Sequence, residues 1–191
     1  MSEFEFIFVL YSLLLGLSLV ELLSGLGRGL EIRLAGTKHG TRLARAGVLT
    51  LLLAIFVLLD LLSFWVFAWR VRDLITVTPA SLLVVMAFAS GYYLAARMVF
   101  PTDAAAFQDL DQHFFRVRRL VMAMLLVLLA VQWTYLLLAG GNQAAIIHPL
   151  NVSLTVVMAA LMLGVMIVRS VRWNAILLLL LIARYLVIYL R

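Results

Sequence analysis

Three polar side chains interrupt long apolar stretches, and they are the positions in this sequence best suited to chemistry. They are Asp60, Gln132 and Arg184. A lone Asp or Arg at the centre of a membrane helix costs about 2.5 to 3.5 kcal/mol on insertion scales. Residues of this kind are retained where they bind ions, carry protons or pair with one another. Together the three could line a path for a proton, an ion or a small solute.

The spacing of these residues predicts that they share one depth. Each lies 12 or 13 residues past the residue that precedes its apolar stretch (Gly47, Arg119 or Arg172), which is about 18 to 20 Å along a helix at 1.5 Å per residue. We therefore expect one buried polar layer in which Asp60 and Arg184 form a charge-compensated pair. Two interpretations give the layer no function. In the first, Asp60 and Arg184 form a static ion pair that locks two helices together. In the second, the Arg184 side chain extends past the depth of the layer and reaches the lipid headgroups near Tyr189.

A second polar group is expected near the cytoplasmic ends of the first and third apolar stretches. Glu21 and Arg97 lie close to the ends of the first and third stretches, and Tyr93 lies nearby in depth. They predict an ion pair near the membrane surface. Such pairs are commonly worth little, so the simpler interpretation is structural.

Motifs that would indicate an enzyme are missing from the sequence. It has no cysteine and no H-E-x-x-H, G-x-S-x-G or P-loop pattern. Its three histidines fall in loops or at helix ends, which disfavours haem ligation within the membrane. Asp103, Asp109, Asp111 and His113 could bind a cation, but a solvated acidic helix face is the simpler reading. We expect no catalytic residue, no metal site and no cofactor.

The composition requires lipid as the surrounding solvent. Of 191 residues, 66% are hydrophobic and 13% are charged, whereas a soluble domain is about half apolar. A spanning helix needs about 20 apolar residues. Six stretches are close to that length: about Phe4 to Leu26, Val48 to Trp69, Pro79 to Phe100, Leu120 to Leu138, Pro149 to Val168 and Trp173 to Leu190.

The basic residues predict the orientation of these spans. Eleven Lys and Arg residues fall on the side of the membrane that holds the first, third and fifth connections, and three fall on the other side. The positive-inside rule then places both termini on the non-cytoplasmic side. The net charge of +6 is confined to short segments between apolar runs, which indicates contact with lipid headgroups and no nucleic-acid partner.

Smaller patterns refine this picture. Residues 101–119 carry apolar side chains at helical spacing and predict a short amphipathic helix on the cytoplasmic interface. Small residues four apart predict close helix contacts, and aromatic residues near the outer ends predict an interfacial belt. The small pairs include Ser12 with Gly16 and Gly25 with Gly29, and the belt includes Trp65, Trp69, Trp133, Tyr135, Tyr185 and Tyr189.

The predicted fold is thus an all-α integral membrane protein, a single six-helix bundle over residues 1–191 with a short interfacial helix. The predicted location is a bacterial inner (plasma) membrane, with lipids as partners and a homo-oligomer or larger membrane complex as the assembly. The polar layer favours a small channel or transporter for a proton, ion or small solute. The alternative is a non-catalytic accessory or assembly subunit, favoured by the short loops and small-residue faces.

Overall fold

The computed structural model describes residues 3–37, 47–72, 77–102, 110–138 and 149–189, and within these ranges the chain is helical with no strand. Each of the six helices is long and apolar enough to cross a membrane. The prediction of a six-helix membrane bundle is therefore confirmed. The helices are α1 (Glu3–Thr37), α2 (Val48–Arg70), α3 (Pro79–Val99), α4 (Leu110–Leu138), α5 (Pro149–Ile167) and α6 (Val171–Tyr189).

Local sequence signals explain where α3 begins. The Thr78 hydroxyl accepts a hydrogen bond from the Ser81 backbone N–H at 3.0 Å, and the Ser81 hydroxyl accepts one from the Thr78 N–H at 2.9 Å. This reciprocal capping box satisfies backbone donors that the first helical turn leaves unpaired. Pro79 follows at the first helical position, where its missing N–H removes no bond.

A separate interfacial helix is not shown. Residues 110–119 form the first turns of α4, which continues without a break to Leu138, while residues 103–109 lie outside the described part of the chain. Leu110 and Phe114 are buried in the bundle rather than laid on a membrane surface. The Thr50 hydroxyl of α2 also donates a 2.6 Å hydrogen bond to the Leu110 carbonyl. These contacts hold the amphipathic segment in line with the rest of α4, as its first turns.

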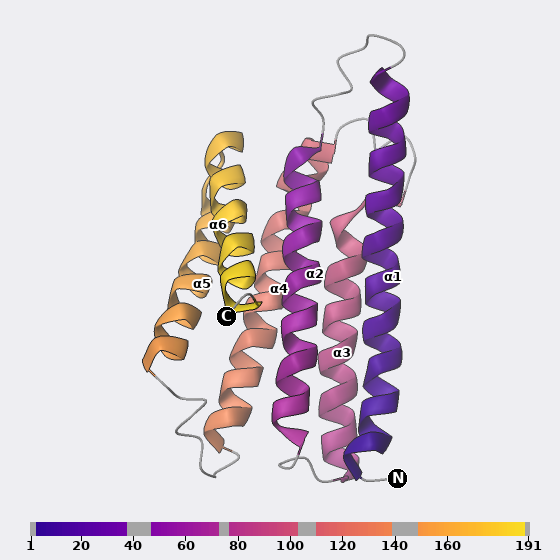
Figure 1. Cartoon of the computed structure of the whole chain (residues 1–191), viewed down its shortest axis with the longest axis vertical. Helices are drawn as coiled ribbons and strands as arrows, with labels where there is room; N and C mark the ends of the chain where they lie inside the picture. The colour runs from indigo at the N-terminus through magenta and orange to yellow at the C-terminus, as the bar shows by residue number, and fades with distance from the viewer. Residues whose placement is uncertain (1–2, 38–46, 73–76, 103–109, 139–148, 190–191) are drawn as a thin grey trace.

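The helices form an elongated bundle with α1 at one side and α5 at the other (Figure 1). Helix α2 lies in the interior and packs against α1, α3, α4 and α6. Helix α3 packs mainly between α1 and α4, and α5 packs against α4 and α6. A polar side chain on the inner face of α2 therefore meets protein on several sides.

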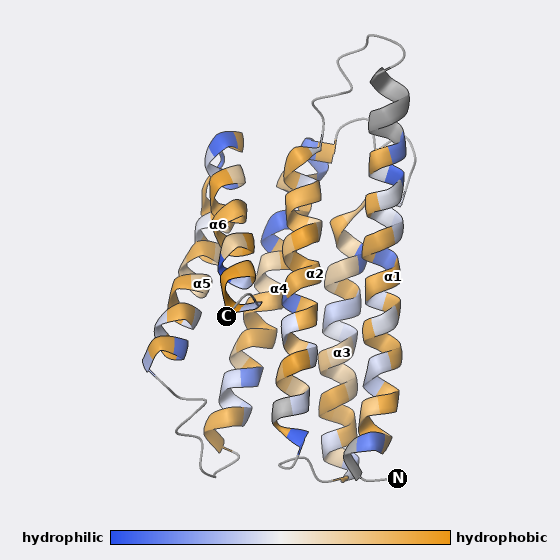
Figure 2. Ribbon diagram, in the orientation of Figure 1, coloured by the Kyte–Doolittle hydropathy of each residue, from blue (hydrophilic) through white to orange (hydrophobic). Residues whose placement is uncertain are grey.

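Hydropathy follows the pattern expected of a chain surrounded by lipid. Apolar residues predominate along the helices, and hydrophilic residues lie mainly toward the helix ends, with isolated hydrophilic positions within the length of α1 to α4 (Figure 2). Many large apolar side chains are exposed, among them Leu13, Leu83 and Ile167. Exposure on this scale is unfavourable in water but expected against acyl chains.

A glycine on α1 permits close contact with the end of α3, as the small-residue spacing predicted. A Cβ atom added at Gly25 would lie 2.1 Å from the Phe100 ring, and Phe100 is itself buried. No side-chain atom could occupy that position unless the ring moved. At Gly16 on the same helix, no atom lies within 4 Å of the corresponding point.

The two glycines provide a matched test of α1 packing. We expect Gly25→Ala to lower the free energy of unfolding by about 1 to 3 kcal/mol, because overpacking a tight contact forces ring and helix apart. Gly16→Ala should leave stability unchanged or raise it, since alanine favours helix. SDS-induced unfolding followed by circular dichroism would measure both. Equal effects of the two substitutions would contradict the close contact.

Candidate functional site

Asp60 is the centre of the candidate site. It lies on the inner face of α2 and is 7% exposed. Its carboxylate accepts two hydrogen bonds, from the Tyr185 hydroxyl of α6 to Oδ1 at 2.5 Å and from the Tyr92 hydroxyl of α3 to Oδ2 at 3.0 Å. One carboxyl group thus joins α2 to its neighbour in sequence, α3, and to the distant helix α6.

Aromatic rings surround the two tyrosines and close the site. The Tyr92 ring stacks on Phe64 with ring centres 5.5 Å apart, and Phe88 lies 4.4 Å from Phe64. On the other side, the Tyr185 ring lies 6.1 Å from Phe56, which is fully buried. The carboxyl group therefore has two hydroxyl partners, mainly apolar neighbours and one nearby cation, Arg184, and in such a surrounding hydrogen bonds and charges act strongly.

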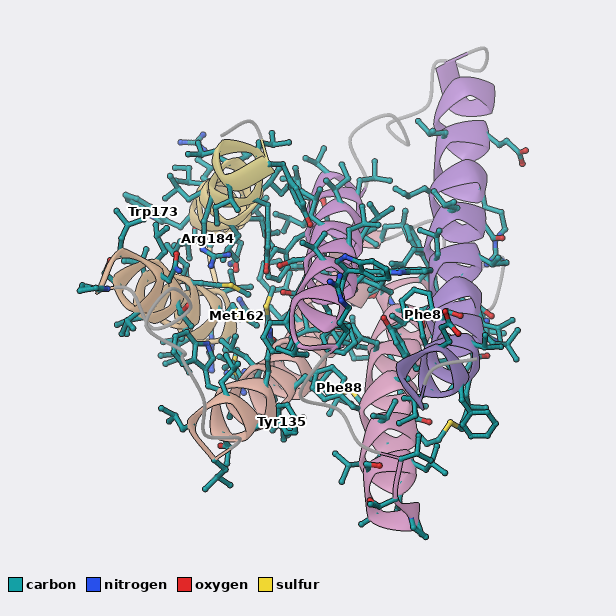
Figure 3. The ribbon with its side chains drawn as sticks, turned by 60° about the horizontal axis from the view of Figure 1, so that its bottom comes forward. Phe8, Phe88, Tyr135, Met162, Trp173 and Arg184 are labelled. Carbon is teal, nitrogen blue, oxygen red and sulfur yellow. The ribbon has the colours of Figure 1, made fainter. Side chains whose placement is uncertain are left out.

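Arg184 does not form the expected ion pair with Asp60. Its Nε donates to the Leu154 carbonyl of α5 at 3.2 Å, and its guanidinium lies 4.9 Å from the centre of the Tyr185 ring. Within the described residues, the hydrogen-bond partners of the Asp60 carboxylate are the two tyrosines alone. Figure 3 places Arg184 beside α5 and α6. The two residues make no direct ion pair, because the neighbouring Tyr185 occupies the position facing α2, but Arg184 remains close enough to Asp60 for their charges to interact.

Gln132 lies in a different environment from Asp60. It lines an open-sided cavity of about 420 Å³ between α1, α2, α3 and α4, together with Tyr11, Phe64, Phe88 and Tyr135. No hydrogen bond joins the Gln132 amide to another described residue. Figure 3 shows Phe88 and Tyr135 close together, away from Arg184. The three residues of the predicted layer are therefore divided among three settings: a tyrosine-bound carboxylate, an arginine bonded to a backbone carbonyl within α5, and a cavity wall.

No known family model matches the chain, and comparison with curated proteins and with solved structures finds no similar protein. The functional argument therefore depends on the geometry of the residues themselves.

Two residues of the second predicted group, Arg97 and Glu21, pair as expected. Arg97 donates to the Glu21 carboxylate at 3.0 Å and links the ends of α3 and α1. The Arg97 and Glu21 side chains are 42% and 26% exposed, so the pair contributes little to stability. Tyr93 is half-buried on α3 and makes no hydrogen bond to another described residue. The contact agrees with the structural interpretation of this pair.

A buried arginine that sequence reasoning treated only as a topology signal organises the basic end of the bundle. Arg118 on α4 is 3% exposed. One of its terminal nitrogens donates to the Val165 carbonyl at 2.6 Å, to the Val168 carbonyl and to the Asn174 side-chain oxygen at 3.1 Å. The Asn174 amide donates in turn to the Val168 and Ser170 carbonyls, each at 2.8 Å. This network binds α4 to the turn between α5 and α6.

Other polar residues near this end also cap helices. The Asp111 carboxylate accepts a 3.4 Å bond from the Leu49 N–H at the start of α2, and His113 lies 3.2 Å from the Met98 carbonyl at the end of α3. Asp103 and Asp109 lie outside the described residues. Among the residues that are described, no three His, Asp or Glu side chains gather as metal ligands.

Sequence reasoning missed the importance of two tyrosines. Tyr185 was assigned to an interfacial belt, yet it is buried and holds the Asp60 carboxylate. Tyr92, the neighbour of Tyr93 in the sequence, holds the second carboxylate oxygen. The sequence did contain a signal for these bonds. A tyrosine hydroxyl on a spanning helix needs a hydrogen-bond partner, and the Asp60 carboxylate was the strongest acceptor at a comparable depth.

Proposed function

We propose that this chain is a small membrane transporter or channel in which Asp60 carries a proton or a small cation. The observation that supports the proposal is the buried carboxyl group held by two uncharged hydroxyls. Hydrogen bonds from Tyr92 and Tyr185 stabilise a carboxylate but do not cancel its charge. A proton or a bound cation would cancel it, and exchange of that ion is the elementary step of coupled transport.

Arg184 acts on Asp60 through its charge but makes no direct ion pair with it, which leaves the carboxylate oxygens to the two hydroxyls. A static ion pair was the main structural explanation for Asp60, and Arg184 is instead bonded to the α5 backbone. An ionisable group with this placement is costly within the bilayer and is typical of proton and ion pathways. The position of Asp60 on the central helix, between α3 and α6, would let a change in its charge alter the packing of both neighbours.

The test is flux through the purified protein in liposomes. Under an imposed pH gradient with the membrane potential clamped, we expect wild type to change the internal pH faster than protein-free liposomes, and Asp60→Asn to abolish the excess. Asp111→Asn removes a carboxylate near the helix ends and serves as the matched control, with unchanged flux. Folded wild-type protein without flux of protons, sodium or potassium would overturn the proposal, as would full flux in Asp60→Asn.

The alternative is a non-catalytic accessory or assembly subunit. It is favoured by the small share of α5 and α6 that is buried within the chain. The spanning part of α5 has 17% of its residues buried within the chain, compared with 39% for α2. The remaining surface could face lipid, a second copy or another subunit. Because the chain has no cysteine, Val156→Cys on the exposed face of α5 would report a homo-oligomer by disulfide crosslinking. Crosslinking without ion flux would favour an assembly role.

We further propose an inner (plasma) membrane location with both termini on the non-cytoplasmic side. The basis is the excess of Lys and Arg at one end of the bundle. A reporter fused after Arg45 should lie in the cytoplasm, and one fused after Gly141 should lie on the other side. A cytoplasmic signal from the second fusion would invert the orientation.

A further inference from the structure

Three arginines gather where α4 meets the turn between α5 and α6. Arg118 is buried there, and Arg119 and Arg169 lie close enough for their positive charges to act on it. The hydrogen-bond acceptors of Arg118 are all uncharged: two backbone carbonyls and the Asn174 side-chain oxygen. None of the three arginines makes a salt bridge to a described carboxylate. No Asp or Glu follows Asp111 in the sequence, so this half of the chain holds no counter-charge for them.

The end of α5 supplies only part of the missing negative charge. Arg118 donates to carbonyls at this helix end, and the Arg119 Nε donates to the Met166 carbonyl in its last turn at 3.3 Å. The C-terminus of a helix carries a partial charge of about −0.5, and three guanidinium groups exceed it by about 2.5 charges. This corner of the bundle therefore has a positive charge that the described residues do not balance.

The arginine cluster can be reached from outside the protein. The Arg119 and Arg169 side chains are exposed. Arg118 makes its three hydrogen bonds through one terminal nitrogen, while the other makes none to a described residue and is not fully enclosed. Guanidinium groups suit phosphate, because their planar N–H donors can bind two of its oxygens at once. A phosphate at this surface could thus contact both α4 and the α5–α6 turn.

The position of the cluster indicates where the phosphate comes from. Arg119 directly precedes the apolar stretch of α4, and Arg169 lies between two spanning helices, where lipid headgroups are expected. Large apolar side chains beside these arginines in the sequence are exposed, among them Leu120, Ile167 and Val171. A phospholipid offers phosphate to the arginines and acyl chains to these neighbours, whereas a soluble phosphate offers only the first.

We infer that the cluster of Arg118, Arg119 and Arg169 binds a phospholipid whose headgroup carries two phosphates, as in cardiolipin. Basic pockets between spanning helices favour headgroups of this kind. Two phosphates bring the excess of about 2.5 charges close to zero, which one phosphate does not. A lipid that bridges α4 and the α5–α6 turn would also hold the last two helices against the bundle. The inference is independent of Asp60, so protein without ion flux retains this site.

The test compares three lipids on the full chain in detergent. Tetraoleoyl cardiolipin has two phosphates, dioleoyl phosphatidylglycerol has one negative charge, and dioleoyl phosphatidylcholine has no net charge. An arginine near an anionic headgroup is worth about five-fold in affinity. By native mass spectrometry we expect the first cardiolipin to bind about five-fold more tightly than phosphatidylglycerol and about 25-fold more tightly than phosphatidylcholine. Cardiolipin should also raise the melting temperature, and millimolar inorganic phosphate should not.

Variants at the exposed arginines locate the site. Arg119→Gln and Arg169→Gln should fold as wild type does, and each should weaken cardiolipin binding about five-fold. Arg28→Gln is the matched control, because it removes an equal charge from an exposed position on α1, at the opposite side of the bundle from α5 (Figure 1). It should leave the affinity for cardiolipin unchanged.

Four results would overturn the inference. They are equal binding of the three lipids, unchanged cardiolipin affinity in the Arg119→Gln/Arg169→Gln double variant, an equal loss of affinity in Arg28→Gln, and stabilisation by inorganic phosphate that matches that by cardiolipin. The last result would show an anion site that does not require a lipid.

Discussion

Replacing Arg118 by methionine is expected to lower the free energy of unfolding by about 2 to 4 kcal/mol. Hydrogen bonds from a charged donor are worth about 1.5 to 3 kcal/mol each, and a cation at a helix C-terminus adds about 0.3 to 2 kcal/mol. The two N–H groups of one Arg118 nitrogen are shared among three acceptors, so the contributions are not simply additive. Methionine keeps most of the side-chain volume but leaves the Val165 and Val168 carbonyls and the Asn174 oxygen without this donor.

Arg116→Met is the matched control for this prediction. It removes an equal charge two residues away on the same helix, but the Arg116 side chain is exposed, and surface substitutions usually change stability by less than about 0.5 kcal/mol. Both variants can be compared by SDS-induced unfolding in the same detergent. A loss in Arg118→Met no larger than that in Arg116→Met would show that the network does not hold α4 to the α5–α6 turn. A double-mutant cycle with Asn174→Ala should give a coupling energy, since the two side chains share the Val168 carbonyl.

The second large effect is expected at the tyrosines that hold Asp60. Tyr92→Phe and Tyr185→Phe should each lower the free energy of unfolding by about 1 to 3 kcal/mol, and the double variant by about 3 to 5 kcal/mol. The rings would still pack against Phe64 and Phe56, so the loss would report the hydroxyl groups. The double variant leaves the buried carboxyl group without a donor, and such a group is far costlier than a satisfied one.

Tyr93→Phe supplies the control because it removes the same atom from α3 at a hydroxyl with no hydrogen bond to a described residue. If Tyr93→Phe lowers the free energy of unfolding as much as Tyr92→Phe does, the hydrogen bonds to Asp60 do not contribute specifically to stability. The tyrosine variants should also alter ion flux, because they change the stability of the charged carboxylate relative to its neutral form. Unaltered flux in double-variant protein that remains folded in the liposomes would count against Asp60 as the ion-carrying group.

The number and limits of most spans could be predicted from sequence because hydropathy is a property of local stretches. Helices α2, α3, α5 and α6 begin and end within two residues of the predicted limits. Helix α1 continues to Thr37 and α4 begins at Leu110, both beyond the apolar stretch. Outside the most apolar region, packing decides where a helix ends, and the burial of Leu110 and Phe114 illustrates this for α4.

The charged positions were also visible from sequence, since a polar residue in an apolar stretch stands out whatever its neighbours. The Glu21–Arg97 contact followed from depth alone, because two long exposed side chains near a membrane surface can reach one another from many helix rotations. The buried role of Arg118 was hidden because a basic residue next to an apolar stretch looks the same whether it faces headgroups or the helix ends of α5 and α6.

The sequence by itself thus determined that the chain crosses the membrane six times and that Asp60 requires a partner within it. Only the tertiary structure decided which partner. Successive residues of a helix point about 100° apart, so Arg184 and Tyr185 share a depth but face different neighbours. The rotation of α6 about its own axis, set by packing against α2 and α5, turns the Tyr185 hydroxyl toward Asp60 and Arg184 toward the Leu154 carbonyl.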